Sequence, residues 1–346
     1  MALYSSLIFA GYAAKLMKKV IIREPGGPEV LELINAPDPV PGIGEVVVRS
    51  HAMGVGWPDI LIRKGVYSWM PPLPASPGSE LSGRVEALGP GVPDIAIGQG
   101  VLVSARNLAT RGGCYTELIS VPASSLYFIP DTADLDEAAC LGNYQVAWAV
   151  LFETTRGFNP KSVLIMGAAG GVGSAAVQLA SHAGMQVIGT ISSNDKAEFA
   201  RRQGADSTID YRTENVAERV RDLTDGNGVD LILDHIGGPK FNHNFDMLAP
   251  WGTIVSYGDL GGTPETGLFQ HIRANGMKAA AVRSFSMHLY DHDPKARRRV
   301  MDHVLELFTT GDIHPPIGSR LPMEQVAKAQ SMVEMGNALG RIILKP

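Results

Sequence analysis

The chain has 346 residues, of which 45% are hydrophobic and 19% are charged. This length exceeds what one hydrophobic core usually serves, and the composition excludes a mainly disordered protein. Thirty Lys and Arg against 35 Asp and Glu give a net charge of −5, so we expect no nucleic-acid partner. Two cysteines, Cys114 and Cys140, exclude a disulfide framework and a four-cysteine zinc lobe.

The chain begins with an apolar segment. Lys15, Lys18 and Lys19 follow this segment rather than precede it, which disfavours a signal peptide. We therefore predict an N-terminal extension over residues 1–16, with a signal peptide as the alternative. No stretch reaches the roughly 20 apolar residues needed to cross a bilayer, so we expect no membrane partner and a cytoplasmic location.

The first third of the chain has the pattern of a β-rich domain. Short apolar runs at residues 20–22, 45–49 and 101–103 are separated by Gly and Pro clusters at 24–28 and 37–44. Such runs predict short strands joined by tight turns.

From residue 162 the pattern changes to alternating strands and helices. A strand at 163–166, a glycine turn and an amphipathic helix are followed by a strand at 186–191 and a helix at 195–203. Further strands are predicted at 230–233 and 252–257, and this order predicts a parallel sheet in an α/β domain.

The last part of the chain carries clear helix signals. Asp293 is a suitable cap for a helix that begins at Pro294, continues to about Thr310 and stops at Gly311. A final strand is predicted at residues 340–344.

The glycine turn, Gly-Ala-Ala-Gly-Gly-Val-Gly at residues 167–173, lies between the predicted strand and helix. Small residues allow a sharp turn there, present backbone amides to a pyrophosphate and let the helix pack on the strand. Ala168 takes the first glycine position of the usual G-x-G-x-x-G pattern. We predict dinucleotide binding by Ala169, Gly170, Gly171, Val172 and Gly173, with a packing turn as the alternative.

The end of the next strand indicates which cofactor binds. NAD sites commonly place an acidic residue there, whereas this chain has Ser192 and Ser193 with Lys196 close by. Two hydroxyls and a cation suit the 2'-phosphate of NADPH. Asp195 opposes this interpretation unless it points to solvent as the cap of the following helix. The alternative for Lys196 is an ordinary exposed lysine.

Four motifs occur in order along the chain: residues 23–31 (REPGGPEVL), 77–80 (PGSE), 167–173 and 338–341 (ALGR). Together they resemble the quinone oxidoreductase (zeta-crystallin-like) branch of the medium-chain dehydrogenase/reductases. The resemblance runs from Met17 to Pro346. It implies a β-rich GroES-like catalytic domain (17–138 and 287–346), a central Rossmann domain (139–286) and a cleft between them.

The same resemblance implies a zinc-free site. Zinc members use a Gly-His-Glu motif, where this chain has Gly78, Ser79 and Glu80. Without a Lewis acid, alcohol oxidation is disfavoured. NADPH-dependent reduction of a quinone or an α,β-unsaturated carbonyl (an enone) is favoured, because it needs hydrogen-bond donors and one proton.

The resemblance also suggests individual site residues. Tyr67 is predicted to donate a proton or position the substrate, with packing on the nicotinamide as the alternative. Asn143 is predicted to hold the carboxamide or the substrate carbonyl, or else to form a capped turn. Tyr211 is expected near the adenosine phosphate, and Tyr257 and Gly258 near the nicotinamide half.

Three other features receive more ordinary interpretations. Gly56 stands where family members often carry Asn, which removes a polar contact. The segment His288, Asp291, His292 and Asp293 is predicted to be a solvated loop rather than a metal site. Cys114 is predicted to be a small buried residue.

Alternative functions and the assembly state complete the expectations. An acyl-thioester (enoyl-CoA or ACP) reductase would need a basic groove, and Arg297 to Arg299 form the only dense basic run. A non-catalytic, crystallin-like NADPH-binding role is the second alternative. Residues 277–285, with Ala279, Ala280, Ala281 and Val282, suit a sheet edge that pairs across a two-fold axis, so we predict a homodimer with a small-molecule substrate.

Overall fold

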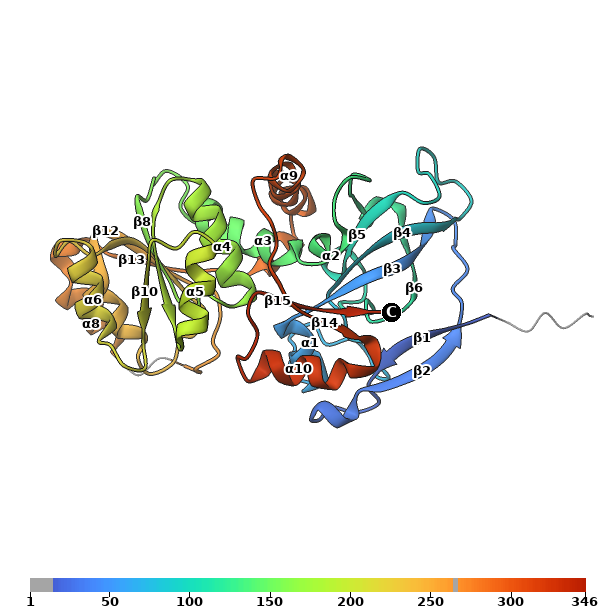
Figure 1. The fold of residues 1–346 in the computed structure, drawn as a ribbon, viewed down its shortest axis with the longest axis horizontal. Helices are drawn as coiled ribbons and strands as arrows, with labels where there is room; N and C mark the ends of the chain where they lie inside the picture. Colours follow the sequence, from blue (N-terminus) through green and yellow to red (C-terminus); the bar gives the residue numbers. More distant parts are fainter. Residues whose placement is uncertain (1–14, 264–266) are drawn as a thin grey trace, which may run out of the picture.

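The computed structural model describes residues 15–263 and 267–346, and the predicted extension lies outside the described residues up to residue 14. Figure 1 shows two lobes side by side, each built on its own sheet. The chain starts in one lobe, forms the other with its middle third, and returns to the first at its C-terminus.

The first lobe contains strands from both ends of the chain. Its main sheet has the order β14 (Ile317–Pro322), β15 (Arg341–Lys345), β3 (Glu45–Val55), β4 (Glu80–Leu88), β5 (Gly100–Ser104) and β7 (Tyr127–Phe128), and β6 (Leu118–Pro122) also pairs with β3. A separate antiparallel pair joins β1 (Leu16–Ile21) to β2 (Glu32–Pro37). Strand β1 thus begins one residue before the predicted domain start. The β-rich domain formed by both chain ends is confirmed.

The second lobe is a parallel sheet of six strands. Its order is β10 (Ser207–Asp210), β9 (Gln186–Ile191), β8 (Ser162–Ile165), β11 (Val229–Asp234), β12 (Leu248–Ser256) and β13 (Ala281–Ser284). In chain order this is the 3-2-1-4-5-6 arrangement of a Rossmann fold. The predicted parallel sheet is confirmed.

Successive residues of the Rossmann strands enter different cores. Val163 and Ile165 of β8 belong to one hydrophobic cluster, whereas Leu164 between them belongs to another on the opposite face. Strand side chains alternate between faces, so both faces of this sheet are buried under helices. This explains why its strands read as continuous apolar runs.

Helix α9 (Pro294–Thr310) connects the two lobes. The Asp293 side chain accepts a hydrogen bond from the Ala296 amide at 2.9 Å, and Gly311 ends the helix at φ 79°, as the sequence predicts. Val300 and Val304 pack in the same core as α3 (Leu141–Trp148) and α4 (Gly171–His182). The assignment of residues 287–346 to the catalytic domain stays a prediction.

The other helices complete both lobes. They are α1 (Trp57–Arg63), α2 (Leu135–Ala138), α5 (Asn194–Arg202), α6 (Val216–Leu223), α7 (Asn244–Met247), α8 (Leu268–Ala274) and α10 (Val326–Glu334). Among the described residues, no helix is long and apolar enough to span a membrane.

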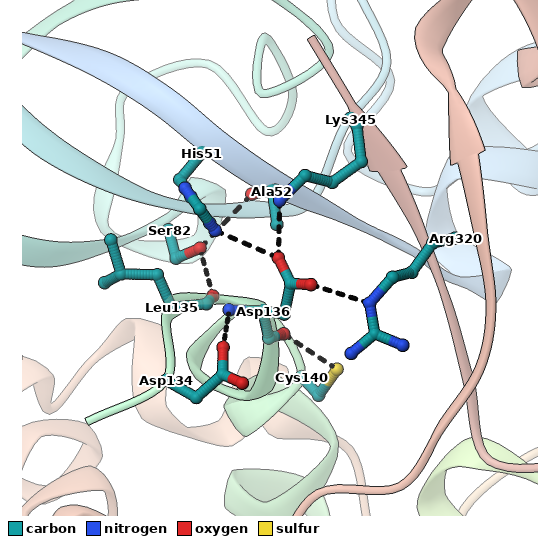
Figure 2. A network of polar contacts seen from close by, with 9 residues as sticks. All are labelled: His51, Ala52, Ser82, Asp134, Leu135, Asp136, Cys140, Arg320 and Lys345. Atoms are coloured by element: carbon teal, nitrogen blue, oxygen red, sulfur yellow. Dashed lines mark hydrogen bonds and ion pairs between the residues drawn. The ribbon is translucent and has the colours of Figure 1, made fainter.

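A charged network fixes α2 to the main sheet of the first lobe (Figure 2). Asp136 accepts hydrogen bonds from Lys345 Nζ at 2.6 Å and Arg320 Nε at 2.7 Å, and His51 Nε2 lies 3.1 Å away. Burial raises the pKa of Asp136, but the bonds from Lys345 and Arg320 outweigh it and hold the pKa below its usual value. Strands β3, β14 and β15 therefore meet at one carboxylate.

Candidate functional site

The glycine turn begins directly after strand β8. Gly170 is the N-cap of α4, and no described residue accepts a hydrogen bond from the backbone amides of Gly171, Val172 or Gly173. Free amides at a helix N-terminus, together with the helix dipole, attract an anion. The turn therefore fits the pyrophosphate of a dinucleotide.

Two of the glycines are closely approached by other groups, and at Gly173 these are backbone atoms. A Cβ on Gly173 would lie 2.1 Å from the Gly167 carbonyl oxygen, and a Cβ on Gly171 would lie 2.4 Å from Nδ2 of Asn143. Any larger residue at position 173 would push α4 away from the turn. The sequence pattern predicts this packing correctly.

Residues of the first lobe, next to strand β15, contact the glycine turn. The Gly340 amide donates to the Ala169 carbonyl at 2.8 Å. The Arg341 guanidinium donates to Asn143 Oδ1 at 2.8 Å and to the Glu80 carboxylate. Asn143 thus lies between the glycine turn and Arg341, and it is not among the residues that line the cavity at Tyr67. The neighbouring Tyr144 is a core residue that donates to Gln178 at 2.8 Å.

The end of β9 gathers the residues predicted to recognise the 2'-phosphate. Lys196 Nζ donates to Ser192 Oγ at 2.8 Å and to the Gly336 carbonyl at 2.9 Å. The Tyr211 amide donates to the Ile191 carbonyl at 3.2 Å, which places Tyr211 beside Ser192, and its side chain is 53% exposed. Ser192, Lys196 and Tyr211 therefore surround one strand end.

The cap of α5 is not Asp195, the residue that the sequence offered as a possible cap. Ser193, not Asp195, is the N-cap, and its hydroxyl accepts from the Lys196 amide at 3.4 Å. Ser193 has the extended backbone that a cap requires, while Asp195 is already helical and lies exposed in the first turn. Asp195 thus points to solvent, but for another reason than capping.

A cavity of about 130 Å³ lies between the lobes at the carboxyl ends of the Rossmann strands. Tyr257 directly follows β12 and Phe285 directly follows β13, and both line it. Tyr67 and Arg106 line the cavity from the first lobe. Ligands in open α/β sheets bind at this edge, outside the carboxyl ends of the strands. The remaining lining residues are Pro58, Val146, Ser286, Met287 and His288.

Tyr67 belongs to a polar chain. Its hydroxyl lies 3.5 Å from Nε2 of His288, and Nδ1 of His288 lies 3.0 Å from Oδ2 of Asp291. Burial raises the pKa of Tyr67, against the opposing charges of Arg106 and Arg111. The hydroxyl therefore keeps its proton at neutral pH and is available as a donor.

The loop at residues 288–293 is not simply solvated, which corrects the sequence interpretation. The side chains of His288 and Asp291 are only 14% and 17% exposed. Trp69 stacks on His288, with ring centroids 3.2 Å apart and planes 8° from parallel. The loop is held because Asp291 also receives Arg111 at 2.7 Å. Sequence spacing gave no sign of these long-range contacts.

The position after β11 holds a further residue that sequence reasoning missed. His235 is partly buried, its buried Nδ1 has no hydrogen-bond partner among the described residues, and a Cβ on Gly167 would lie 2.8 Å from its ring. Burial lowers the pKa of His235, so the ring is neutral. A Cβ on Gly258 would lie 2.6 Å from the His235 carbonyl oxygen, which explains the glycine there.

Ser79 stands where the zinc enzymes that this sequence resembles carry a histidine, and it contacts a buried carboxylate. Asp59 accepts hydrogen bonds from the Ser79 hydroxyl at 2.6 Å, the Gly56 amide at 2.8 Å and the Tyr115 hydroxyl at 3.0 Å. Residues 15–263 and 267–346 contain no group of three or more His, Cys, Asp or Glu side chains arranged to hold a metal.

A Cβ on Gly56 would lie 3.0 Å from Arg341 Nη1, so a guanidinium occupies the space beside this glycine. Cys114 is fully buried, as predicted.

Comparisons with known proteins agree with this architecture. Residues 42–131 match the alcohol dehydrogenase GroES-like domain, and residues 171–303 match the zinc-binding dehydrogenase domain. A quinone oxidoreductase of Pseudomonas aeruginosa is 34% identical over 332 residues, covering 96% of this chain and 100% of the relative. The chain therefore belongs to the medium-chain dehydrogenase/reductases.

Within this family the chain belongs to the quinone oxidoreductase branch, and it is an oxidoreductase. Two solved structures resemble it over 95% of this chain and 100% of their own. One is mycobacterial Rv1454c complexed with NADPH (TM-score 0.82, 30% identity). The other is an NAD-dependent alcohol dehydrogenase (TM-score 0.85, 32% identity).

Proposed function

We propose that this chain reduces a quinone or an enone with NADPH, and that Tyr67 supplies the proton. The observation that carries this proposal is the cavity at the carboxyl edge of the Rossmann sheet, which is lined by Tyr67, Tyr257 and Arg106. It lies at the same edge as the free amides of the glycine turn. A reducible small molecule in the cavity would thus lie next to a dinucleotide held by the turn.

The choice of NADPH rests on the end of strand β9. Lys196 and Ser192 lie within 2.8 Å of each other there, and no acidic side chain follows the strand directly. The NADPH complex of the mycobacterial neighbour supports this choice, whereas the NAD-dependent neighbour makes NADH the alternative. A lysine ammonium with a hydroxyl favours a phosphate over a ribose hydroxyl.

The residues of this chain supply binding and proton placement. When bound, NADPH supplies a hydride for the β-carbon of the acceptor. The Gly171 to Gly173 amides would hold the pyrophosphate, while Tyr257 and Gly258 would border the nicotinamide half. The Tyr67 hydroxyl would then donate one proton to the reduced acceptor. Asn143, fixed by Arg341, would orient the cofactor beside the turn.

The thioester-reductase alternative finds little support. Arg297 is buried and paired with Asp291 at 3.1 Å. Arg298 donates to the Leu126 carbonyl at 2.6 Å and lies over the Tyr127 ring. Two of the three arginines in the basic run therefore already have partners within the protein.

We also propose a homodimer in the cytoplasm. Strand β13 pairs only with β12 among the described residues, so its other edge is open. Ala281 is exposed on this edge, and Met277 just before it is 99% exposed. An unpaired apolar edge favours pairing with a second copy. Light scattering at micromolar concentration should give the mass of a dimer, and a monomer would contradict it.

NADPH oxidation with a panel of small quinones and enones tests the activity. Turnover with NADPH at a higher kcat/KM than with NADH is expected. NADPH binding without turnover of any acceptor would instead support the crystallin-like alternative. Turnover restricted to acyl thioesters would support the thioester reductase.

A further inference from the structure

Arg106 is a cation in the proposed active site. It lines the cavity with Tyr67 and Tyr257, and it is partly buried. Its carbonyl oxygen accepts from Arg111 Nη1 at 2.8 Å. Within residues 15–263 and 267–346, its guanidinium has neither a hydrogen-bond acceptor nor an ion-pair partner.

The other charged groups around the cavity are already paired. Arg111 and Arg297 both contact the Asp291 carboxylate, at 2.7 and 3.1 Å, and His288 contacts it as well. The Glu80 carboxylate is bound by Arg341. Two arginines share one aspartate and Arg106 adds a further positive charge. The Asp59 carboxylate, which is hydrogen-bonded to the neutral groups of Ser79, Gly56 and Tyr115, offsets this positive charge only in part.

A partly buried guanidinium without a counter-charge is unfavourable, because it loses hydration and gains no partner. A carboxylate would suit this guanidinium well, since arginine binds carboxylates through two parallel hydrogen bonds. The oxyanion of a reduced acceptor exists only during turnover. A permanent carboxylate on the acceptor would neutralise Arg106 throughout binding.

We propose that Arg106 binds a carboxylate of the acceptor, and that the preferred substrates are enones or quinones bearing a carboxylate. This proposal rests on the proposed function for its reaction, but the anion site itself can be tested without turnover. Arg106 would act on the affinity and orientation of the substrate, while Tyr67 would remain the proton donor.

A matched pair of acceptors provides the test. (E)-4-oxopent-2-enoate and its methyl ester share one enone skeleton and differ in charge. The ratio of their kcat/KM values should fall about 10- to 100-fold in Arg106→Gln, the usual worth of a charge-assisted hydrogen bond. Arg106→Lys should recover part of the ratio. The control Arg84→Gln removes an exposed charge that pairs with Asp131 and should leave the ratio unchanged.

A binding measurement separates this proposal from the proposed function. With NADPH present, 4-oxopentanoate, which is already saturated, should raise the Tm of the wild type more than its methyl ester does. The difference should vanish in Arg106→Gln. An unchanged kcat/KM ratio in Arg106→Gln would overturn the proposal. Weaker binding of NADPH by Arg106→Gln would also overturn it, because Arg106 would then bind the cofactor instead of the acceptor. If no acceptor is reduced but the Tm difference depends on Arg106, the anion site stands and the proposed reaction fails.

Discussion

The Tyr67 hydroxyl lies 3.5 Å from Nε2 of His288. Because the Asp291 carboxylate can only accept, Nδ1 of His288 carries the proton and Nε2 of the neutral ring is an acceptor. In the resting site the Tyr67 hydroxyl therefore points its proton at His288, which positions the phenol oxygen. The hydroxyl would turn toward a bound acceptor to deliver this proton. Trp69 stacks on the imidazole and holds its plane. The proposed proton donor is positioned by a histidine 221 residues away in sequence.

Replacing Tyr67 by Phe tests its role as proton donor. Loss of the hydroxyl should lower kcat by about 10- to 1,000-fold with little change in NADPH affinity, because the interaction is made mostly in the transition state. Steady-state kinetics and NADPH fluorescence titration measure the two effects. An intact kcat in Tyr67→Phe with a damaged Tyr67→Ala would assign Tyr67 to packing and the proton to water.

His288 should act through Tyr67. We expect His288→Gln to lower kcat by about 3- to 30-fold, less than Tyr67→Phe, since a misplaced donor is still present. In the double variant, the loss should equal that of Tyr67→Phe alone, as for residues in one network. Independent, multiplying losses would show that His288 has a separate role.

Lys196→Ala tests the cofactor choice. Binding of NADPH should weaken by about 1.5 to 3 kcal/mol, because a charge-assisted hydrogen bond to the 2'-phosphate is lost, while NADH binding should hardly change. Lys161→Ala is the control, since Lys161 is exposed just before β8, at the opposite edge of the sheet. Equal losses for both cofactors would remove the basis for NADPH preference.

Arg341→Ala should destabilise the protein strongly. It would leave the Glu80 carboxylate buried without its partner, which typically costs about 3 to 5 kcal/mol. Urea unfolding measures the change. Arg23→Ala, which removes an exposed pair with Glu32, should change the free energy of unfolding by about 1 kcal/mol or less. Similar changes in the free energy of unfolding in both variants would show that the buried pair stabilises the protein no more than an exposed pair does.

The Asp136 network should make stability depend on pH. Since the folded pKa of Asp136 is lowered, its contribution is fully present above the unfolded pKa of about 4 and is lost as pH falls through the folded pKa. Asp136→Asn should lower the free energy of unfolding at pH 7 by about 1 to 2 kcal/mol. That difference should shrink below about pH 4. A difference that is constant with pH would contradict the charge-based account.

Local patterns in the sequence predicted the elements that local physics determines. The capped helix from Pro294 and the turn that requires Gly173 follow from neighbouring residues alone. The sequence left open whether Asp195 caps α5, because Ser193 and Asp195 are both good caps, and the backbone conformation decides for Ser193.

The centre of the candidate site could not be predicted in this way. Arg106 comes from the loop after β5, and His288 lies beyond β13. Their proximity to Tyr67 depends on how the two lobes pack, and no periodicity or spacing in the sequence records it. The pairing of Arg341 with Glu80 spans 261 residues and was missed for the same reason.

Isotope transfer from the cofactor tests the central claim most directly. NADPH deuterated at C4, in each stereochemical form, would be incubated with the enzyme and (E)-4-oxopent-2-enoate or its methyl ester, and the product analysed by mass spectrometry and NMR. The proposed reaction predicts a saturated ketone that carries one cofactor deuterium at C2, the carbon β to the ketone. Only one of the two stereochemical forms of the labelled cofactor should deliver it. A reduced product without cofactor deuterium, or an intact enone with both forms, would contradict it.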